Sequence, residues 1–474
     1  MSSSKVHVAA VDLGATSGRV IVGSFNAEGL DLNEVHRFPN ALRKLNGFAY
    51  WDVGHLCHEV VEGLKKAKSL YPELRACGVD TWGVDHALLN KEGRLVFPVH
   101  SYRDERTRNL VDRIIQKGED RQLYDWTGMP MVPFNTTFQL AETLEGVPAM
   151  REVIERVLHL PDYFNFLLCG EMVNELSNVA TGQLVQAHGI EYSQEVFEYF
   201  QFPRHWFDTP QLAGKTLGNI KGVPELADVQ VALVAGHDTS CAFEAIPPIG
   251  SDMIVSTGTW MLPGALSDKP VTGDKAFKTG FAGERTGRGQ YRPNRQMLGL
   301  WLLEQILPAF NKRPTNDAEW EALVDAAQAL PQSRVRIDLN DKSLFNPDNM
   351  KEAIERQLAQ NGGKAPDTLE EYMRLICDSL GQGIADAVSD FSEVTGQTYD
   401  HVIFVGGGSK NRLLCQRAAD CSGLTVTSYK LEGTAVGNIG YQLLALGEIH
   451  AMSEFHEVVA KNIEKRAYHP KGSS

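Results

Sequence analysis

Residues Val231 to Ser240 read Val-Ala-Leu-Val-Ala-Gly-His-Asp-Thr-Ser, a short apolar run that ends at a glycine and a polar cluster. This pattern predicts a buried strand that carries functional groups at its carboxyl end. Because ligands in open α/β sheets bind beyond the carboxyl ends of the strands, Asp238 is the candidate catalytic base, with His237 and Thr239 beside it. Taken alone, Gly-His-Asp fits equally well a plain turn whose aspartate caps a helix.

The size and charge of the chain narrow the classes of protein to consider. With 474 residues it is too long for one ordinary domain, so two are expected, and the length also allows a third. The balance of 46 Lys and Arg against 60 Asp and Glu gives a formal net charge of −14, which disfavours electrostatic binding to nucleic acid or anionic membranes. No apolar run approaches the roughly 20 residues that span a bilayer. Seven scattered cysteines and a start without a signal peptide's apolar core predict a cytoplasmic protein.

Two segments of the chain combine a strand, small hydroxyl residues, a glycine and a second strand. The first, residues 12–19, reads Asp-Leu-Gly-Ala-Thr-Ser-Gly-Arg, and the second, residues 256–260, reads Ser-Thr-Gly-Thr-Trp. Small residues let backbone amides approach a phosphate, and Thr16, Ser17 and Arg19 can add donors. Asp12 could hold a hydrated Mg²⁺. A plain Gly-rich hairpin explains each segment by itself.

A third cluster suits the binding of a polyol. Residues 80–85 read Asp-Thr-Trp-Gly-Val-Asp after an apolar strand, and Tyr102-Arg103-Asp104 lies close by in sequence. Polar groups bind hydroxyls, and a glycine leaves room for a ligand. The alternative for the segment Tyr102-Arg103-Asp104 is a solvated run of charges. Residues 108–200 are expected to be largely helical and to close over the substrate.

The second half of the chain contains a candidate nucleotide site. The apolar strand at residues 401–405 leads into Gly406-Gly407-Gly408 and a helix start near Asn411, where the backbone can lie against a base or ribose without side-chain hindrance. The pattern also predicts helices at 294–310 and 368–394, and a loop at 214–223. A hinge or boundary is expected at residues 247–250, Pro-Pro-Ile-Gly.

The usual nucleotide-binding signatures are missing from the sequence. No Gly-x-x-x-x-Gly-Lys-Ser/Thr motif exists, and Gly406-x-Gly408 is followed by Asn411 where a dinucleotide fold requires glycine. The motif set of protein kinases does not occur either. What remains is an arrangement with two phosphate hairpins, a central aspartate and a late glycine triplet.

Taken in order, these segments resemble the FGGY carbohydrate kinases, which share the actin/hexokinase/Hsp70 ATPase fold. The resemblance covers nearly the whole chain and rests on residues 11–19, 80–85, 133–136, 160–164, 236–239, 256–260 and 406–408. It implies an α/β protein with two actin/hexokinase-like (ribonuclease H-like) domains around a central cleft. Residues 1–246 would hold the sugar site and the first phosphate hairpin, and residues 247–474 the second hairpin and the adenosine loop.

The same resemblance implies an ATP- and Mg²⁺-dependent kinase acting on the C1 hydroxyl of a ketose, as a monomer or small homo-oligomer. L-rhamnulose is the expected substrate, L-fuculose or another ketose the alternative, and a non-catalytic sugar or nucleotide sensor the rival from another class. By this resemblance Asp238 is the proton acceptor, and the sugar contacts are Gly83, His237 and Thr239, with Trp82, Tyr102 and Arg103 nearby. The expected nucleotide contacts are Ala15, Thr16, Ser17, Gly18, Arg19, Thr259, Gly407 and Asn411. Gln296 and Glu304 stand where family members tend to carry Asn and Gln as ATP contacts.

Overall fold

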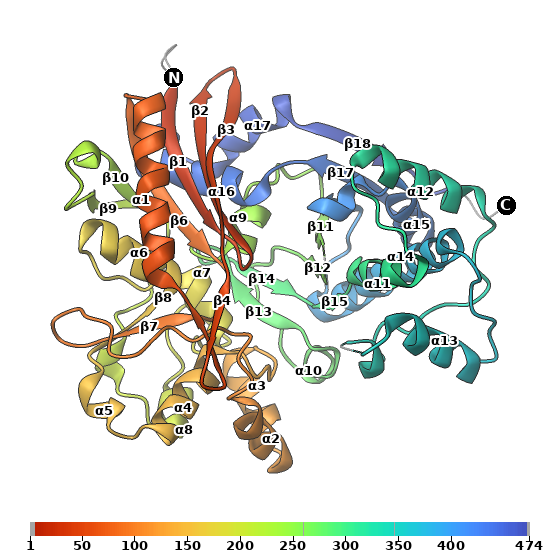
Figure 1. Ribbon diagram of the computed structural model, residues 1–474, viewed down its shortest axis with the longest axis horizontal. Coiled ribbons are helices and arrows are strands. Elements are labelled where there is room, and N and C mark those ends of the chain that lie inside the picture. Colours follow the sequence, from red (N-terminus) through yellow and green to blue (C-terminus); the bar gives the residue numbers. More distant parts are fainter. Residues whose placement is uncertain (1–4, 259, 346, 472–474) are drawn as a thin grey trace. The chain divides into compact units, whose positions relative to one another are not determined.

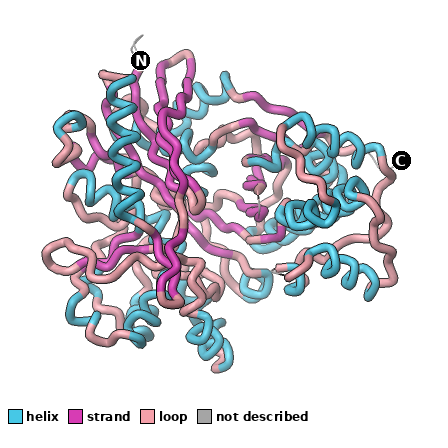
Figure 2. Tube along the Cα trace, viewed as in Figure 1, coloured by secondary structure: helices cyan, strands magenta, loops and turns pink. Residues whose placement is uncertain are grey.

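The computed structural model describes residues 5–258, 260–345 and 347–471 (Figures 1 and 2). The chain forms two compact units. The first consists of Met1–Pro247, Leu266–Pro293 and Glu432–Asn462, and the second of Pro248–Ala265, Asn294–Leu431 and Ile463–Ser474. The chain therefore passes between the units several times, whereas the sequence was divided once, at residue 246. That single division into two domains stays a prediction.

A six-stranded sheet forms the centre of the first unit, in the order β3-β2-β1-β6-β10-β9. Its strands are β1 (Val6–Leu13), β2 (Ser17–Asn26), β3 (Gly29–Pro39), β6 (Leu74–Thr81), β9 (Lys215–Asn219) and β10 (Gln230–Leu233). Strands β1, β6 and β10 run parallel, and β1 and β2 form the expected antiparallel hairpin. The parallel strands bring their carboxyl ends to one edge of the sheet. The strand β9 corrects the expected loop at 214–223, because Lys215–Asn219 pairs antiparallel with β10.

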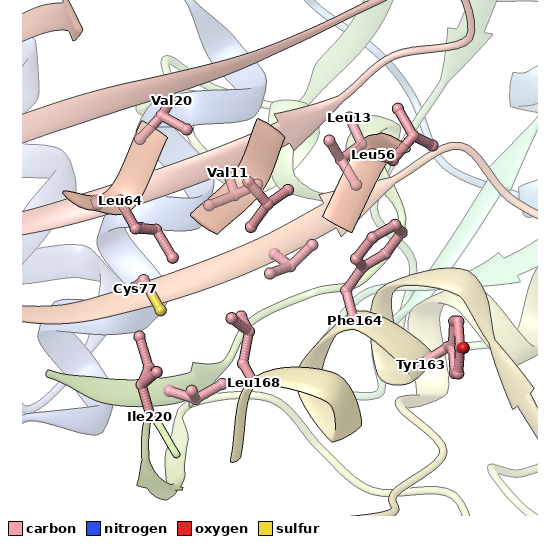
Figure 3. Packing of buried hydrophobic residues seen from close by; sticks show 14 of the residues in the cluster. Val11, Leu13, Val20, Leu56, Leu64, Cys77, Tyr163, Phe164, Leu168 and Ile220 are labelled. Atoms are coloured by element: carbon pink, nitrogen blue, oxygen red, sulfur yellow. The ribbon is translucent and has the colours of Figure 1, made fainter. Parts of the chain in front are cut away.

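Helices bury the central sheet. The inward face of α1 (Val53–Leu70) carries Leu56, Val60 and Leu64, which recur at helical spacing, and Asp52 caps its start by accepting a hydrogen bond from the His55 amide. These side chains pack with Val11 of β1 in one apolar cluster that also includes residues of α6 (Leu160–Cys169; Figure 3). Helix α16 (Gly433–Ala445) contacts β1, β6 and β10.

The segment between residues 108 and 200 is mostly helical, as expected. Its helices are α2 (Arg108–Gln116), α3 (Asp120–Thr127), α4 (Thr136–Gly146), α5 (Met150–Val153), α6, α7 (Leu176–Val179) and α8 (Gln194–Phe200). One strand interrupts them, β8 (Arg156–His159), which pairs with β7 (His86–Leu89). Further elements of this unit are β4 (Leu42–Leu45), β5 (Phe48–Trp51), α9 (Asp238–Glu244), α10 (Asp274–Thr279), β13 (Ala282–Arg285), β14 (Tyr291–Asn294, ending in the second unit) and α17 (Met452–Asn462).

The second unit contains the strand order β12-β11-β16-β17-β18. These strands are β11 (Asp252–Thr257), β12 (Trp260–Gly264), β16 (His401–Val405), β17 (Thr425–Lys430) and β18 (Glu464–Tyr468). Its helices are α11 (Trp301–Ile306), α12 (Asp317–Ala329), α13 (Met350–Gln360), α14 (Leu369–Thr395) and α15 (Arg412–Ser422). The expected helix at 368–394 is confirmed, and Thr368 and Glu371 form a capping box at its start. No described helix is both long and apolar enough to span a membrane.

The expected helix at 294–310 is wrong for residues 294–300. Met297 and Leu298 form a short strand, β15 (Met297–Leu298), which pairs antiparallel with β12. Helix α11 begins only at Trp301, after the Leu300 amide donates to the Gly258 carbonyl at 3.1 Å. The apolar run is equally compatible with a buried strand, and pairing with β12 decides the matter.

Candidate active site

Asp238 stands at the first residue of α9, beyond the carboxyl end of β10. The Thr81 amide of β6 donates to the Gly236 carbonyl at 2.9 Å, so the Asp238 loop continues alongside the neighbouring strand. Thr239 donates to Asp238 through its amide and, at 3.0 Å, through its hydroxyl, and both bonds fall on Oδ1. The side chain keeps 30% exposure. A fixed and accessible carboxylate can accept a proton from a bound hydroxyl.

Two further carboxylates lie at the same edge of the sheet. Asp12 and Asp80 are register partners on the parallel strands β1 and β6, and both are buried. Burial, opposed by Arg19, raises the pKa of Asp12, and burial followed by the charge of Asp12 raises the pKa of Asp80 well above its ordinary value. Asp80 Oδ2 accepts a 2.6 Å bond from Asn438, while its Oδ1 has no hydrogen-bond partner among the described residues. The edge of the sheet therefore concentrates negative charge that a cation would relieve.

Arg19 supplies the nearest positive charge. Its Nε and Nη2 donate to Asp12 Oδ2 at 3.0 and 2.8 Å, and its Nη1 donates to Glu432 at 2.9 Å. The two carboxylates hold the guanidinium in one orientation beside the first hairpin. Guanidinium groups bind phosphate oxygens well, which agrees with the predicted role of Arg19.

The turn of the first hairpin is tight. The Gly14 amide donates to the Ser17 carbonyl at 2.9 Å, and the Asn40 side chain donates to the Gly14 carbonyl at 2.9 Å. A Cβ on Gly18 would meet the Phe38 ring at 2.3 Å, so only glycine fits there without rearrangement. Ala15 is half-buried and Thr16 is exposed at the tip. The turn thus presents small residues and backbone to solvent, as a phosphate loop requires.

Asp85 organises the aromatic residues of the predicted polyol cluster, residues 80–85 and 102–104. Its fully buried carboxylate accepts hydrogen bonds from Trp51 Nε1 at 2.6 Å, Trp82 Nε1 at 2.8 Å and the Tyr102 amide at 3.0 Å on one oxygen, and from Gln139 at 2.9 Å on the other. The two indole rings lie 4.2 Å apart between centroids. Burial, opposed by these donors, raises the pKa of Asp85 to about 6. Asp85 therefore fixes Trp82 and the Tyr102 backbone together.

Replacement of Asp85 by alanine is expected to raise the KM for the sugar about tenfold or more, because it leaves buried donors without a partner at about 1–3 kcal/mol each. The KM for ATP should change less than about threefold, since this cluster is predicted to contact the sugar and not the nucleotide. Asp85→Asn keeps one acceptor and should be intermediate. Steady-state kinetics with both substrates varied, together with unfolding midpoints, measures the effect. Equal increases in both KM values would show that Asp85 stabilises the fold without shaping the sugar site.

The remaining predicted sugar contacts lie around this cluster. A Cβ on Gly83 would meet Thr181 at 2.8 Å, so the glycine permits close packing of its loop. Val84 adopts a positive φ of 69°, a strained conformation that the Thr181 hydroxyl supports by accepting its amide at 2.9 Å. Arg103 is exposed and stacks over the Tyr102 ring at 5.4 Å.

Glu175 connects the loops after β6 and β10, and sequence reasoning missed it. Its buried carboxylate accepts bonds from the Gly236 amide at 2.8 Å, the Ser177 hydroxyl at 2.7 Å and the Asn178 amide at 3.1 Å. Asn178 in turn donates to the carbonyls of Trp82 and Gly236 at 3.3 and 3.1 Å. Burial raises the pKa of Glu175 to about 7. Nothing in the sequence near Glu175 indicates this role, because the two loops that it connects lie about 60 and 95 residues away in the chain.

Glu175 makes the stability of the first unit pH-dependent in a defined direction. Its pKa is about 7 in the folded protein and 4.5 in its ordinary state. Between pH 4.5 and pH 7 the Glu175 carboxyl is ionised in the unfolded chain and protonated in the folded one. The free energy of unfolding therefore falls by about 3 kcal/mol as the pH rises through this range. The free energy of unfolding of the wild type minus that of Glu175→Gln should therefore fall between pH 5 and pH 8. Denaturant titrations at both pH values test this, with exposed Glu225 supplying the matched Glu225→Gln control. A difference that is constant with pH would contradict it.

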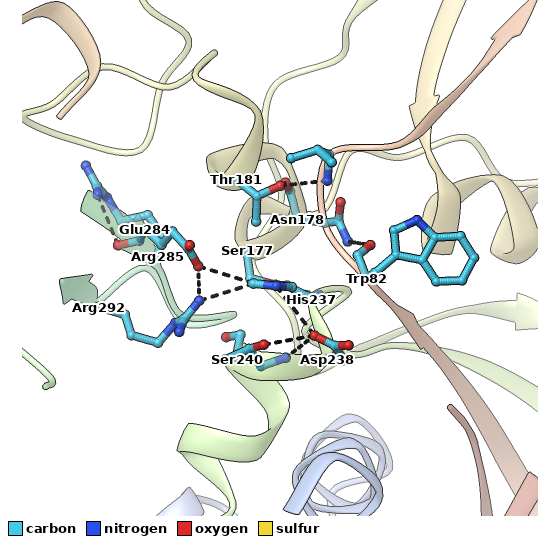
Figure 4. A network of polar contacts seen from close by, with 12 residues as sticks. Trp82, Ser177, Asn178, Thr181, His237, Asp238, Ser240, Glu284, Arg285 and Arg292 are labelled. Carbon is cyan, nitrogen blue, oxygen red and sulfur yellow. Dashed lines mark hydrogen bonds and ion pairs between the residues drawn. The ribbon is translucent and has the colours of Figure 1, made fainter. Parts of the chain in front are cut away.

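His237 makes contact with two charged residues that sequence reasoning also missed. Arg292 Nη2 lies 3.1 Å from His237 Nδ1, and Glu284 Oε2 lies 3.3 Å from the same nitrogen (Figure 4). Arg292 and Glu284 form an ion pair. On the other side of the ring, Nε2 lies 3.5 Å from Asp238 Oδ1. The sequence shows only that Glu284 and Arg292 are charged residues, on what the structure shows to be the short strands β13 and β14, and this does not indicate a contact with His237.

The second unit holds the other predicted nucleotide residues. Gly406 has a φ of 85°, and a Cβ there would meet the Thr257 carbonyl at 2.5 Å, so the turn after β16 requires glycine. A Cβ on Gly407 would meet nothing within 4 Å. Strands β11 and β12 pair antiparallel, as expected for the second hairpin. Thr259 lies outside the described residues.

The last three predicted nucleotide contacts differ in their surroundings. Asn411 is buried, and its side chain caps α15 by accepting the Leu414 amide at 3.1 Å and donates to Cys377 Sγ at 3.6 Å. Its side chain therefore has a structural task in this unit. Gln296 and Glu304 are both exposed, Gln296 before β15 and Glu304 on α11. Their contacts with a nucleotide stay predictions.

The donor set at the edge of the first sheet fits Mg²⁺. In the part of the chain that the structure describes, no three His, Cys, Asp or Glu side chains are arranged as a metal cage. Mg²⁺ usually takes one or two carboxylates and completes its shell with water and substrate phosphates. Asp12, with its neighbour Asp80, whose Oδ1 has no hydrogen-bond partner within the described part of the chain, offers such a partial set.

Comparisons with known proteins define the class. The FGGY family of carbohydrate kinases matches the chain twice, through its N-terminal domain at residues 7–242 and its C-terminal domain at residues 253–446. The chain belongs to this family and is a carbohydrate kinase. It is 35% identical to the rhamnulokinase of Klebsiella pneumoniae (strain 342) over 471 residues, which cover 99% of this chain and 95% of that protein.

Solved structures support the same fold. Gluconate kinase from Lactobacillus acidophilus superposes with a TM-score of 0.81 at 16% identity, covering 99% of this chain and 94% of that one. Plasmodium falciparum glycerol kinase with ADP gives 0.78 at 13% identity, covering 99% and 94%. At such identities the likeness concerns the fold, and the expected actin/hexokinase-like α/β architecture is confirmed.

Proposed function

We propose that the protein transfers the γ-phosphoryl group of ATP to the C1 hydroxyl of L-rhamnulose, giving L-rhamnulose 1-phosphate and ADP. The observation that carries the proposal is the fixed, accessible carboxylate of Asp238 at the same sheet edge as Asp12 and Arg19. The 35% identity to a rhamnulokinase supports the choice of sugar. A cytoplasmic location and a monomer or small homo-oligomer stay predictions from the sequence.

In the proposed mechanism Asp238 acts as the general base. It accepts the proton of the C1 hydroxyl while the oxygen attacks the γ-phosphorus in line, and the bond from that phosphorus to the bridging oxygen of ADP breaks. Arg19 and the backbone amides of residues 15–18 stabilise the negative charge on the phosphoryl oxygens. When bound near Asp12, Mg²⁺ would neutralise part of the charge of the phosphates.

The surroundings of Asp238 support the sugar assignment. His237 and Thr239 flank the carboxylate. Glu175 accepts a hydrogen bond from the preceding Gly236, and Asn178 connects Gly236 to the loop that carries Trp82. Asp85 holds the Trp51 and Trp82 rings together beside the Tyr102 backbone, and an aromatic group of this kind suits a sugar that carries a methyl group.

An ATP-coupled assay across six substrates tests the proposal: L-rhamnulose, L-fuculose, L-ribulose, D-xylulose, D-ribulose and glycerol. The expected result is the highest kcat/KM for L-rhamnulose, with NMR of the product placing the phosphate on C1. Preference for another ketose would keep the kinase and replace the sugar. Absence of turnover with all six, despite ATP binding, would favour the sensor.

A further inference from the structure

We propose that Arg292, held in place by its ion pair with Glu284, is a positioning residue that fixes the His237 ring as the tautomer with its proton on Nε2. In this state the ring presents a hydrogen-bond donor on the side that faces Asp238. The part of the proposal that concerns sugar binding rests on the function proposed above. The tautomer itself is a property of the protein alone.

The contact between Arg292 and His237 sets the tautomer. Arg292 Nη2 lies 3.1 Å from His237 Nδ1. A guanidinium has only donors, so Nδ1 accepts this bond and cannot carry a proton while the bond exists. A neutral imidazole then keeps its single proton on Nε2, 3.5 Å from Asp238 Oδ1 (Figure 4).

Glu284 has two opposing effects on the same nitrogen. Its carboxylate pairs with Arg292, whose side chain is 1% exposed, and a buried guanidinium needs such a counter-charge. Glu284 Oε2 also lies 3.3 Å from His237 Nδ1 and could accept a proton from it. Arg292 and Glu284 therefore favour opposite tautomers, and the donor on Arg292 decides between them.

Burial, and not the surrounding carboxylates, keeps the His237 ring neutral. Burial lowers the pKa of His237 to about 4, with Asp238 and Glu175 acting to raise it and Arg292 to lower it. Glu284, on β13, completes the charged groups that face the ring. At physiological pH the ring has one proton, so its position determines whether the ring donates or accepts toward the sugar.

With this tautomer, His237 and Asp238 have different roles in the reaction. His237 Nε2 already carries a proton and cannot receive the one released by the C1 hydroxyl. That proton goes to Asp238, and His237 donates a hydrogen bond to a sugar oxygen. Arg292 and Glu284 do not touch the sugar in this scheme, and they act only through the ring.

Three variants test the pair by kinetics with L-rhamnulose, or with the ketose that the wild type prefers. In Arg292→Met, Glu284 remains as an acceptor beside Nδ1 and favours the tautomer with its proton on Nδ1. Nε2 then presents a lone pair instead of a donor on the side that faces Asp238. The KM for the sugar should therefore rise about tenfold. In Glu284→Gln, Arg292 still donates and the KM should stay within about threefold. The double variant removes both influences, and its KM should fall below that of Arg292→Met. A merely structural pair predicts the reverse order, with the double variant the worst, and that order would overturn the proposal.

A spectroscopic measurement tests the tautomer without any turnover. In the ¹⁵N spectrum of histidine-labelled wild type at pH 7.5, the His237 signals are those absent from His237→Gln. We expect a protonated Nε2 and an unprotonated Nδ1, and the reverse in Arg292→Met. A proton on Nδ1 in the wild type would overturn the proposal even if every variant failed to fold. A failed sugar assignment would leave this result unchanged, so the two failures are distinguishable.

Discussion

Asp238→Asn is expected to lower kcat by about 10³-fold, within the range that general-base catalysis contributes, while the KM for the sugar changes less than about threefold. The substitution preserves the shape of the side chain. Its remaining oxygen can still accept the two bonds from Thr239. The amide cannot accept the proton of the attacking hydroxyl, so binding is retained and the transfer step is impaired.

Steady-state rates with the preferred ketose and calorimetric titration of the sugar would separate these effects. Asp228→Asn is the matched control, because Asp228 is exposed and pairs only at the surface with Lys68. Such surface pairs contribute about 0–1 kcal/mol, so the control should behave as wild type. A kcat for Asp238→Asn within about tenfold of wild type would assign the proton to another group.

The residues of the site that sequence reasoning found share one property. Asp12 and Asp80 lie at the carboxyl ends of β1 and β6, and Asp238 lies a few residues beyond β10; parallel strands bring such residues to one edge. The strand pattern therefore predicted the positions of Asp12 and Asp238, whereas Asp80 was predicted only as part of the polyol cluster and the fold class followed from the resemblance to the FGGY family. The hairpin at residues 12–19 followed from the same pattern, because glycines and hydroxyls separate two apolar runs.

The residues that sequence reasoning missed reach the site from distant segments. Glu175 lies on a loop before α7, and Glu284 and Arg292 come from an excursion of the chain between two segments of the second unit. Their role depends on burial beside the Asp238 loop. A charged residue in sequence is usually solvated, and only tertiary packing shows that Arg292 is not.

The local sequence pattern also failed to predict the structure where the same residues suit two different structures or roles. Met297 and Leu298 lie within an apolar run that suits a helix, yet they complete a sheet by pairing with β12. Asn411 follows a glycine triplet and was predicted to contact a nucleotide, yet its side chain caps α15. A helix start offers both uses to an asparagine, and the sequence does not distinguish them.

Asp12→Asn is expected to lower kcat/KM for ATP by about 100-fold and to raise the Mg²⁺ concentration needed for half-maximal rate, because the variant loses both a carboxylate for the ion and the main counter-charge of Arg19. Arg19 would keep its 2.9 Å bond to Glu432, but it would lose the two charged bonds to Asp12 Oδ2. The guanidinium would then be held from one side only. The KM for the sugar should change little.

Glu432→Gln separates the two contributions of Asp12. Glu432 is the other carboxylate partner of Arg19, and its side chain is 58% exposed, so its loss should reduce the rate less than about threefold. Magnesium titrations of both variants at saturating ATP give the comparison. If Asp12→Asn loses activity with an unchanged Mg²⁺ requirement, Asp12 acts only by orienting Arg19. If the requirement shifts in Asp12→Asn and not in Glu432→Gln, the carboxylate of Asp12 serves the ion, and the orientation of Arg19 is its second task.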